Sequence, residues 1–177
     1  MPHLSGTSGG GGSAISEAAG GFSSVASDGP LYTKEGVLAH FEGMLETLEL
    51  KRQIADLGCG MNSFFTKGRS LMEFTAMCVG LWKLALDQSF PDEAEEFFNE
   101  FLTSSAALGK GKKRARMLEL IAEYNELFLP KKAADFTGIS QHMADSLANA
   151  SVDRKSLQLK ISLLIRKLYQ TIFDHLI

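Results

Sequence analysis

Apolar residues recur at intervals of three and four over most of the chain from residue 31 onward. Such spacing places side chains on one face of an α-helix, so the pattern predicts helices. One helix is expected over residues 33–57, a second from Ser70, a third from Ser89 and a fourth over 113–128. Two short helices near 131–136 and 140–149 and a last one over 153–175 complete the set. No long strand-like alternation occurs, so we predict an all-α bundle of about five main helices with a short helix-turn-helix-like corner.

Helix starts are predicted from capping residues. Thr33 is expected to cap the first helix. Ser70 and Glu73 have the spacing of a capping box for the second. Ser89 is expected to cap the third, with Pro91 in its first turn. The helix that follows Ser70 is apolar around most of its circumference, which is typical of a helix at the centre of a bundle.

The first 30 residues have a different composition, rich in Gly, Ser and Ala. Such a segment buries too little apolar surface to offset the entropy of ordering its backbone. We therefore expect residues 1–30 to be a disordered tail and residues 31–177 to be a single α-helical domain. The tail is either passive or an unfolded export or docking signal.

Composition narrows the class of protein. The chain has 177 residues, of which 45% are hydrophobic, and this suits one globular domain. The net charge of −3 argues against a generally basic coat for nucleic acid but allows a local basic patch. Two cysteines, Cys59 and Cys78, make no disulfide framework and fit a reducing compartment. No membrane-spanning run or secretory signal is found, so a cytoplasmic location without membrane contact is expected.

The stretch QIADLGCGMNSFF, residues 53–65, contains a glycine motif. Ile54, Asp56, Gly58 and Gly60 resemble the first motif of S-adenosylmethionine-dependent methyltransferases, a resemblance that implies a parallel sheet and a cofactor site. The residues that follow have helical rather than strand-like spacing. We therefore favour the alternative, in which Gly58 takes the left-handed conformation that ends a helix and Cys59 packs on the last turn.

A second segment, GKGKKRARM, concentrates positive charge. Lys110, Lys112, Lys113, Arg114 and Arg116 lie close enough in sequence to neutralise phosphates together. Neither Lys110 nor Lys112 is followed by the Ser or Thr of a nucleotide-binding loop. The other interpretation is a solvated loop that faces the acidic helix after Ser89.

The run KKAADFTGISQHMADSLANAS, residues 131–151, resembles the helix-turn-helix of lactose-repressor-type bacterial regulators. Ala134 matches the alanine of the first helix, Gly138 the turn residue with positive φ, and Ser140 the cap of the second helix. Ile139 and Leu147 would fill the core between the helices. The resemblance implies that Gln141, His142 and Ser146 read base edges and that Lys131 and Lys132 contact phosphate. The alternative is a plain corner between two helices of a bundle.

No catalytic, cofactor or metal site is predicted, because the four histidines are scattered and no ligand motif accompanies them. The last helix has more apolar residues than one stripe needs, so it either enters the core or meets a second copy. The leading hypothesis is a non-enzymatic helical interaction or adaptor protein that self-associates, with a protein partner or a second copy of itself. A DNA-binding transcriptional regulator is the alternative, and an S-adenosylmethionine-dependent methyltransferase the remote one.

Overall fold

The computed structural model describes residues 32–58, 64–128, 136–148 and 152–176. These residues form helices joined by short connections, with no strand among them, which confirms the predicted all-α class. The elements are α1 (Lys34–Thr47), α2 (Leu50–Asp56), α3 (Phe64–Ser89), α4 (Ala94–Ser104), the 3₁₀ helix η1 (Ala106–Leu108), α5 (Gly111–Phe128), α6 (Thr137–Leu147) and α7 (Arg154–Asp174). The predicted tail at residues 1–30 and the predicted short helix at 131–136, except Phe136, lie outside the described residues.

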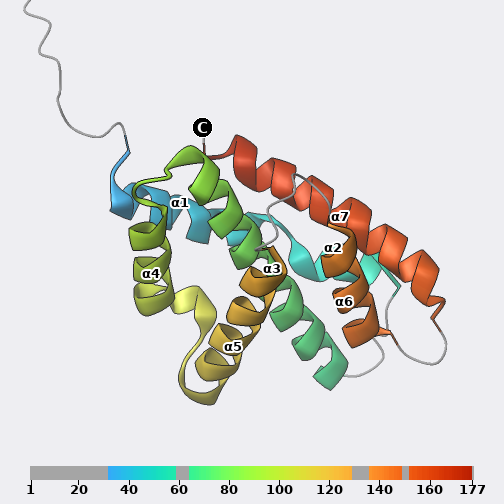
Figure 1. The fold of residues 1–177 in the computed structure, drawn as a ribbon. Helices are drawn as coiled ribbons and strands as arrows, with labels where there is room; N and C mark the ends of the chain where they lie inside the picture. Colours follow the sequence, from blue (N-terminus) through green and yellow to red (C-terminus); the bar gives the residue numbers. More distant parts are fainter. Residues whose placement is uncertain (1–31, 59–63, 129–135, 149–151, 177) are drawn as a thin grey trace, which may run out of the picture. The chain divides into compact units, whose positions relative to one another are not determined.

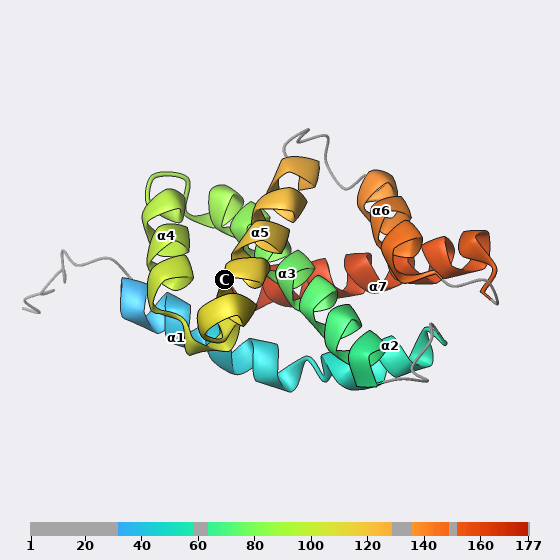
Figure 2. The same cartoon turned by 90° about the horizontal axis from the view of Figure 1, so that it is seen from below.

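Helix α3 is the central helix of the domain. It packs against α2, α4, α5 and α7, as Figures 1 and 2 show from two directions. Nine of its apolar side chains have no exposed surface: Phe74, Ala76, Met77, Cys78, Val79, Leu81, Trp82, Ala85 and Leu86. The prediction that this helix lies at the centre of the bundle is therefore confirmed, because neighbouring helices cover its apolar surface on several sides.

The first predicted helix is interrupted, so the prediction of one helix over residues 33–57 was wrong. Thr33 does cap α1, and its hydroxyl accepts the Gly36 N–H at 3.1 Å. The interruption is at Glu49, whose φ is 47°. Leu48 and Leu50 would point to nearly opposite sides of a continuous helix, whereas the break lets both be buried. Figure 2 shows α1 and α2 as successive helices with this break between them.

The predicted starts of the second and third helices were also wrong. Helix α3 begins at Phe64, so Ser70 lies inside it and is 1% exposed. It continues through Ser89, and α4 begins only at Ala94 after a turn in which the Ala94 N–H bonds to the Phe90 carbonyl. Ser70 is buried within α3 and Ser89 is its last residue, so neither caps a helix, because a capping pattern is local and does not show which residues tertiary packing buries.

The remaining helices follow the prediction closely. In α4, Ala94, Phe97, Phe98 and Phe101 are buried as one stripe. Helix α5 begins two residues before the predicted start and buries Met117, Leu120, Ile121 and Tyr124. Helix α7 is capped by Asp153, whose carboxylate accepts the Ser156 N–H at 3.2 Å. One face of α7 packs on α3 and α6 through Leu157, Ile161, Leu164, Ile165, Leu168 and Ile172.

Gly58 ends α2 as predicted. Its φ is 70°, and its N–H bonds to the Ala55 carbonyl at 3.0 Å. This is the left-handed conformation that glycine adopts with little strain. Cys59 and Gly60 lie outside the described residues. Because no strand occurs in the described ranges, the parallel sheet implied by the methyltransferase resemblance is not found there.

Gly80 marks a close approach of α3 to α5. A Cβ atom at this position would lie 2.7 Å from Cε2 and 3.0 Å from Cδ2 of Phe128. We expect Gly80→Ala to lower the free energy of unfolding by about 1–2 kcal/mol, since the overlap outweighs the gain in helix propensity. The matched control is Gly43→Ala in α1, where a Cβ meets nothing within 4 Å. That change should stabilise by about 0.5–1 kcal/mol. Urea unfolding measures both values, and equal effects would contradict the close approach.

Candidate functional site

A groove with a volume of about 860 Å³ lies among five elements of the domain. Helices α1 and α2 supply one group of lining residues, α3 supplies a second, and η1 with α5 supplies a third. The apolar and small lining residues are Leu45, Leu50, Gly68, Leu71, Met72, Ala106, Ala107 and Met117. Thr75 also lines the groove, but its hydroxyl donates to the Leu71 carbonyl at 2.7 Å. The groove therefore offers mainly apolar surface.

Charged side chains complete the lining of this groove. Glu42 and Glu46 are one turn apart on α1, and Glu49 follows at the break before α2. Glu49 pairs with Arg52 at 3.3 Å, whereas Glu42 and Glu46 have no ion pair or hydrogen bond with another described residue. Lys51 and Lys113 are the two basic lining residues. The α1 side of the groove is thus acidic, and its Glu42 and Glu46 carboxylates have no partner among the described residues.

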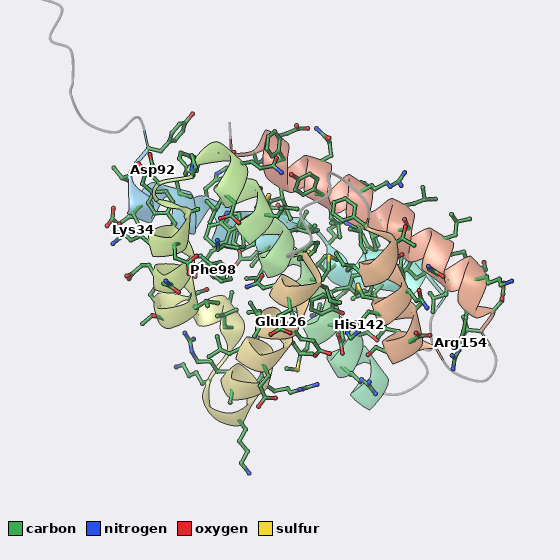
Figure 3. The ribbon with its side chains drawn as sticks, viewed as in Figure 1. Lys34, Asp92, Phe98, Glu126, His142 and Arg154 are labelled. Carbon is green, nitrogen blue, oxygen red and sulfur yellow. The ribbon has the colours of Figure 1, made fainter. Side chains whose placement is uncertain are left out.

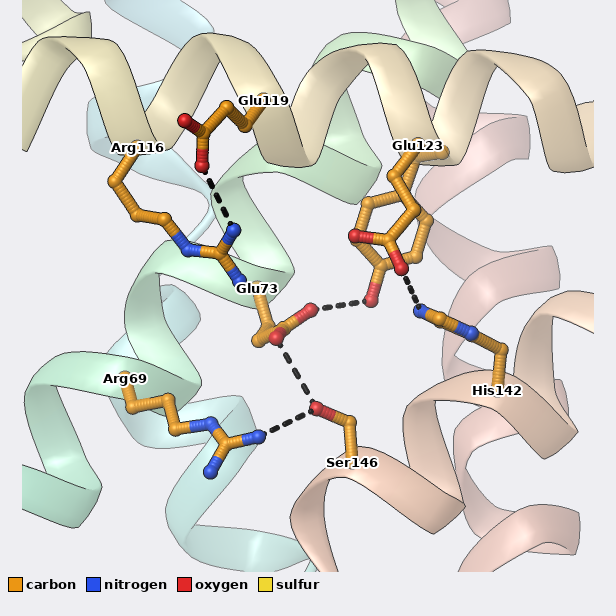
Figure 4. A network of polar contacts seen from close by, with 8 residues as sticks. Arg69, Glu73, Arg116, Glu119, Glu123, His142 and Ser146 are labelled. Atoms are coloured by element: carbon orange, nitrogen blue, oxygen red, sulfur yellow. Dashed lines mark hydrogen bonds and ion pairs between the residues drawn. The ribbon is translucent and has the colours of Figure 1, made fainter.

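A polar cluster joins α3, α5 and α6. Glu73 of α3 is 4% exposed and accepts the Tyr124 hydroxyl at 2.7 Å and the Ser146 hydroxyl at 3.1 Å. Arg69 donates to the Ser146 oxygen at 3.2 Å (Figure 4). Burial raises the pKa of Tyr124, and the Glu73 carboxylate raises it further. Because the buried carboxylate has donors from two other helices, the cluster holds α6 against α3 and α5.

This cluster was missed in the sequence, where Glu73 was assigned to a capping box. The available signal was an isolated acidic residue within an otherwise apolar helical run. Such a residue needs hydrogen-bond partners when it is buried. Sequence spacing does not reveal Tyr124 and Ser146 as those partners, because they are 51 and 73 positions away.

The residues of the helix-turn-helix resemblance do not lie as that module requires. Gly138 is the second residue of α6 and is not among the glycines with positive φ. Ser140 is 1% exposed inside α6, where its hydroxyl donates to the Thr137 carbonyl at 2.9 Å, so it is not the cap. The structure corrects both predictions. Ala134, which the resemblance assigns to the first helix, lies outside the described residues.

The predicted base-reading side chains have different surroundings. Gln141 is exposed. His142 points toward α5 (Figure 3), where its Nε2 is 3.4 Å from Glu123 Oε1 and its ring packs edge-on against Tyr124. Ser146 belongs to the polar cluster. Two of the three predicted contacts are therefore turned toward the domain itself.

The basic residues of the segment 110–116 have different contacts in the structure. Arg114 donates to the carbonyls of Leu102, Thr103 and Ser105, the last two at 2.8 Å. It thereby satisfies the carbonyl end of α4, which lacks helical partners. Arg116 pairs with Glu119 at 3.0 Å, and Lys113 lines the groove. Lys110 and Lys112 are exposed, while Lys131 and Lys132 lie outside the described residues.

The two arginines of this segment should differ in their effect on stability. We expect Arg114→Ala to lower the free energy of unfolding by about 1–3 kcal/mol, because three carbonyls lose a charged donor. Arg116→Ala removes only an exposed pair and should change it by less than about 0.5 kcal/mol. Chemical denaturation followed by circular dichroism compares the two. Similar losses for both variants would show that Arg114 has no special role.

Other kinds of site find little support in the described part of the chain. No three His, Cys, Asp or Glu side chains come together there as a metal-binding group. None of the helices in those ranges combines the length and the apolarity that crossing a membrane requires. The chain matches no known family model, no curated protein and no solved structure.

Proposed function

We propose that this protein is a non-enzymatic interaction protein that binds an amphipathic helix of a partner in the groove. The observation that carries the proposal is the lining of the groove, with apolar surface supplied by α3 and its neighbours and, along α1, the carboxylates of Glu42 and Glu46, which pair with no described residue. An apolar centre with charged edges is the usual composition of a protein-binding surface. A helix that docks in such a groove presents one apolar face.

The details of the lining favour a helix over a small polar substrate. Thr75 is the one uncharged polar side chain among the described lining residues, and its hydroxyl is already engaged. A small-molecule site needs polar groups that converge on the ligand and fix its orientation. Met72 is a half-buried, flexible side chain, which adapts well to the apolar residues of a partner. The carboxylates of Glu42 and Glu46 favour a partner helix that carries basic residues.

The DNA-binding alternative has less support. Arg114 caps α4, Ser146 belongs to the polar cluster, and His142 lies against Glu123 and Tyr124. Lys110, Lys112, Lys113 and Arg116 are exposed, but Lys113 lines the groove and Arg116 pairs with Glu119, which leaves a small electrostatic footprint for DNA.

The test uses the full chain and a labelled peptide of about 20 residues. The peptide carries leucines at helical spacing flanked by lysines, and fluorescence anisotropy measures its binding. We expect saturable binding that is weakened at least tenfold by Glu42→Lys/Glu46→Lys. The matched control, Glu35→Lys/Glu126→Lys, reverses two exposed glutamates that do not line the groove and should bind like the wild type. No binding, or equal binding by both double variants, would refute the proposal.

A further inference from the structure

The outward side of α7 carries apolar residues that the domain does not cover. Leu159 is 63% exposed and Leu163 is 58% exposed, and with Tyr32 they are the exposed large apolar side chains of the described residues. They are four positions apart, so they lie one turn apart on the same face of the helix. Helix α7 is therefore apolar on its buried face and also has a short apolar stripe on its outer face.

Basic residues flank this stripe. Lys155, Lys160, Arg166 and Lys167 are all exposed, and none pairs with a described residue. The helical period places Lys160 and Lys167 on one side of the two leucines and Lys155 and Arg166 on the other. The sequence of α7 has no acidic residue before Asp174. Arg154 is separate from this set because it pairs with Asp145 of α6 at 3.4 Å.

We infer that the helix received by the groove is the outer face of α7 in a second copy of this chain. This inference rests on the proposed function of the groove and names its partner. Leu159 and Leu163 are the apolar anchors, and the groove supplies the apolar surface that they need. Glu42 and Glu46, which pair with no described residue, are one turn apart on α1 and meet the flanking cations of α7, which likewise pair with no described residue. The two surfaces are complementary in both polarity and charge.

The charges of the groove affect the two edges of α7 differently. Lys51 and Lys113 line the groove as well, and they would repel basic residues placed near them. Because basic residues flank the two leucines on both sides, one basic edge of α7 lies along the α1 side, next to Glu42 and Glu46, and repulsion by Lys51 and Lys113 weakens the contact at the other edge. Because the groove and α7 are different surfaces, the contact is head-to-tail, and it adds copies in succession unless a ring closes. Two leucines form a small apolar centre, so the association is weak and depends on concentration.

The test relies on two variants that each damage one of the two surfaces. Glu42→Lys/Glu46→Lys alters the groove and leaves α7 intact, whereas Leu159→Gln/Leu163→Gln alters α7 and leaves the groove intact. Sedimentation velocity of the full chain should show a mass that grows with concentration for the wild type. Each variant alone should remain a single chain at the same concentrations. Their equimolar mixture should reach the mass of two chains and no more, because one intact groove then meets one intact α7.

Several results would overturn the inference. They are a wild type that remains a single chain at every concentration, variants that associate like the wild type, and a mixture that does not form the two-chain species. The control Glu35→Lys/Glu126→Lys should associate normally. All of the changed residues except Glu42 are largely exposed, and circular dichroism checks that each variant is folded.

A further comparison separates this inference from the proposed function. The Leu159→Gln/Leu163→Gln variant has an intact groove and is titrated with the leucine–lysine peptide. Peptide binding without self-association of the wild type rejects α7 as the partner and keeps the groove as a helix-binding site. If neither peptide binding nor self-association is observed, both the proposed function of the groove and the inference about α7 are rejected. If anionic lipid vesicles bind the wild type through Leu159 and Leu163 while copies do not associate, the outer face of α7 serves a lipid surface and the inference fails.

Discussion

The free energy of unfolding is expected to fall by up to about 4 kcal/mol between pH 9 and pH 12 through the Cys78 thiol alone. Cys78 lies on α3 with no exposed surface, and burial raises its pKa from 9.0 to about 12. In the unfolded chain the thiol ionises near its ordinary pKa, whereas in the folded protein it stays protonated. The unfolded state then binds fewer protons above pH 9, so stability that is complete below that pH is lost as the pH rises toward 12.

The measurement compares urea unfolding of the wild type and Cys78→Ala, under reducing conditions, from pH 8 to pH 12. The variant should lose less stability per pH unit, and the difference should appear first just above pH 9. Tyr124 and Lys83 also contribute at alkaline pH. Burial raises the pKa of Tyr124. Burial lowers the pKa of Lys83, but hydrogen bonds to Asp87 and Glu95 outweigh this and raise it. Parallel curves for the wild type and Cys78→Ala would show that Cys78 is not the source.

Replacement of Trp82 by alanine should lower the free energy of unfolding by about 3–5 kcal/mol. Trp82 has no exposed surface, and its ring stacks on Phe41 of α1 with centroids 4.3 Å apart and planes 2° apart. It also lies 5.0 Å from the ring of Phe101 in α4. One side chain thus joins α1, α3 and α4, and its removal leaves a cavity at the point where the three helices meet.

Trp82→Phe is the matched variant. The indole Nε1 of Trp82 is buried without a hydrogen-bond partner among the described residues. An unpaired buried donor is costly, so its removal partly offsets the lost volume. The loss should therefore be only about 1–2 kcal/mol. Thermal and urea unfolding give both values. A loss below about 1 kcal/mol for Trp82→Ala would contradict the central position of this residue.

The proposed self-association differs from these stability effects because it depends on exposed side chains. Leu159 and Leu163 contribute little to the core of one chain. Changes at these positions should abolish association while thermal unfolding of the single chain stays nearly the same. Trp82→Ala should instead weaken folding, and association would be lost only as a consequence.

The sequence by itself determined the features that depend on neighbouring residues along the chain. The spacing of apolar residues is enough to identify the helices, since one helical face must be buried whatever covers it. Thr33, Gly58 and Asp153 were recognisable as helix ends because their contacts lie within four residues. The all-apolar helix after Ser70 was recognisable as central for the same local reason.

The tertiary structure alone decided the features whose partners are distant in sequence. The first helix breaks at Glu49 because Leu48 and Leu50 are both buried. The residues that bury them cannot be identified from the local spacing of apolar residues. Glu73 became a buried hydrogen-bond acceptor, and Arg114 became the cap of α4. The groove is lined by residues from five elements, so it cannot be predicted from any single segment of the sequence. Burial and charge pairing depend on which surfaces meet in space, so they became visible only when the helices were packed.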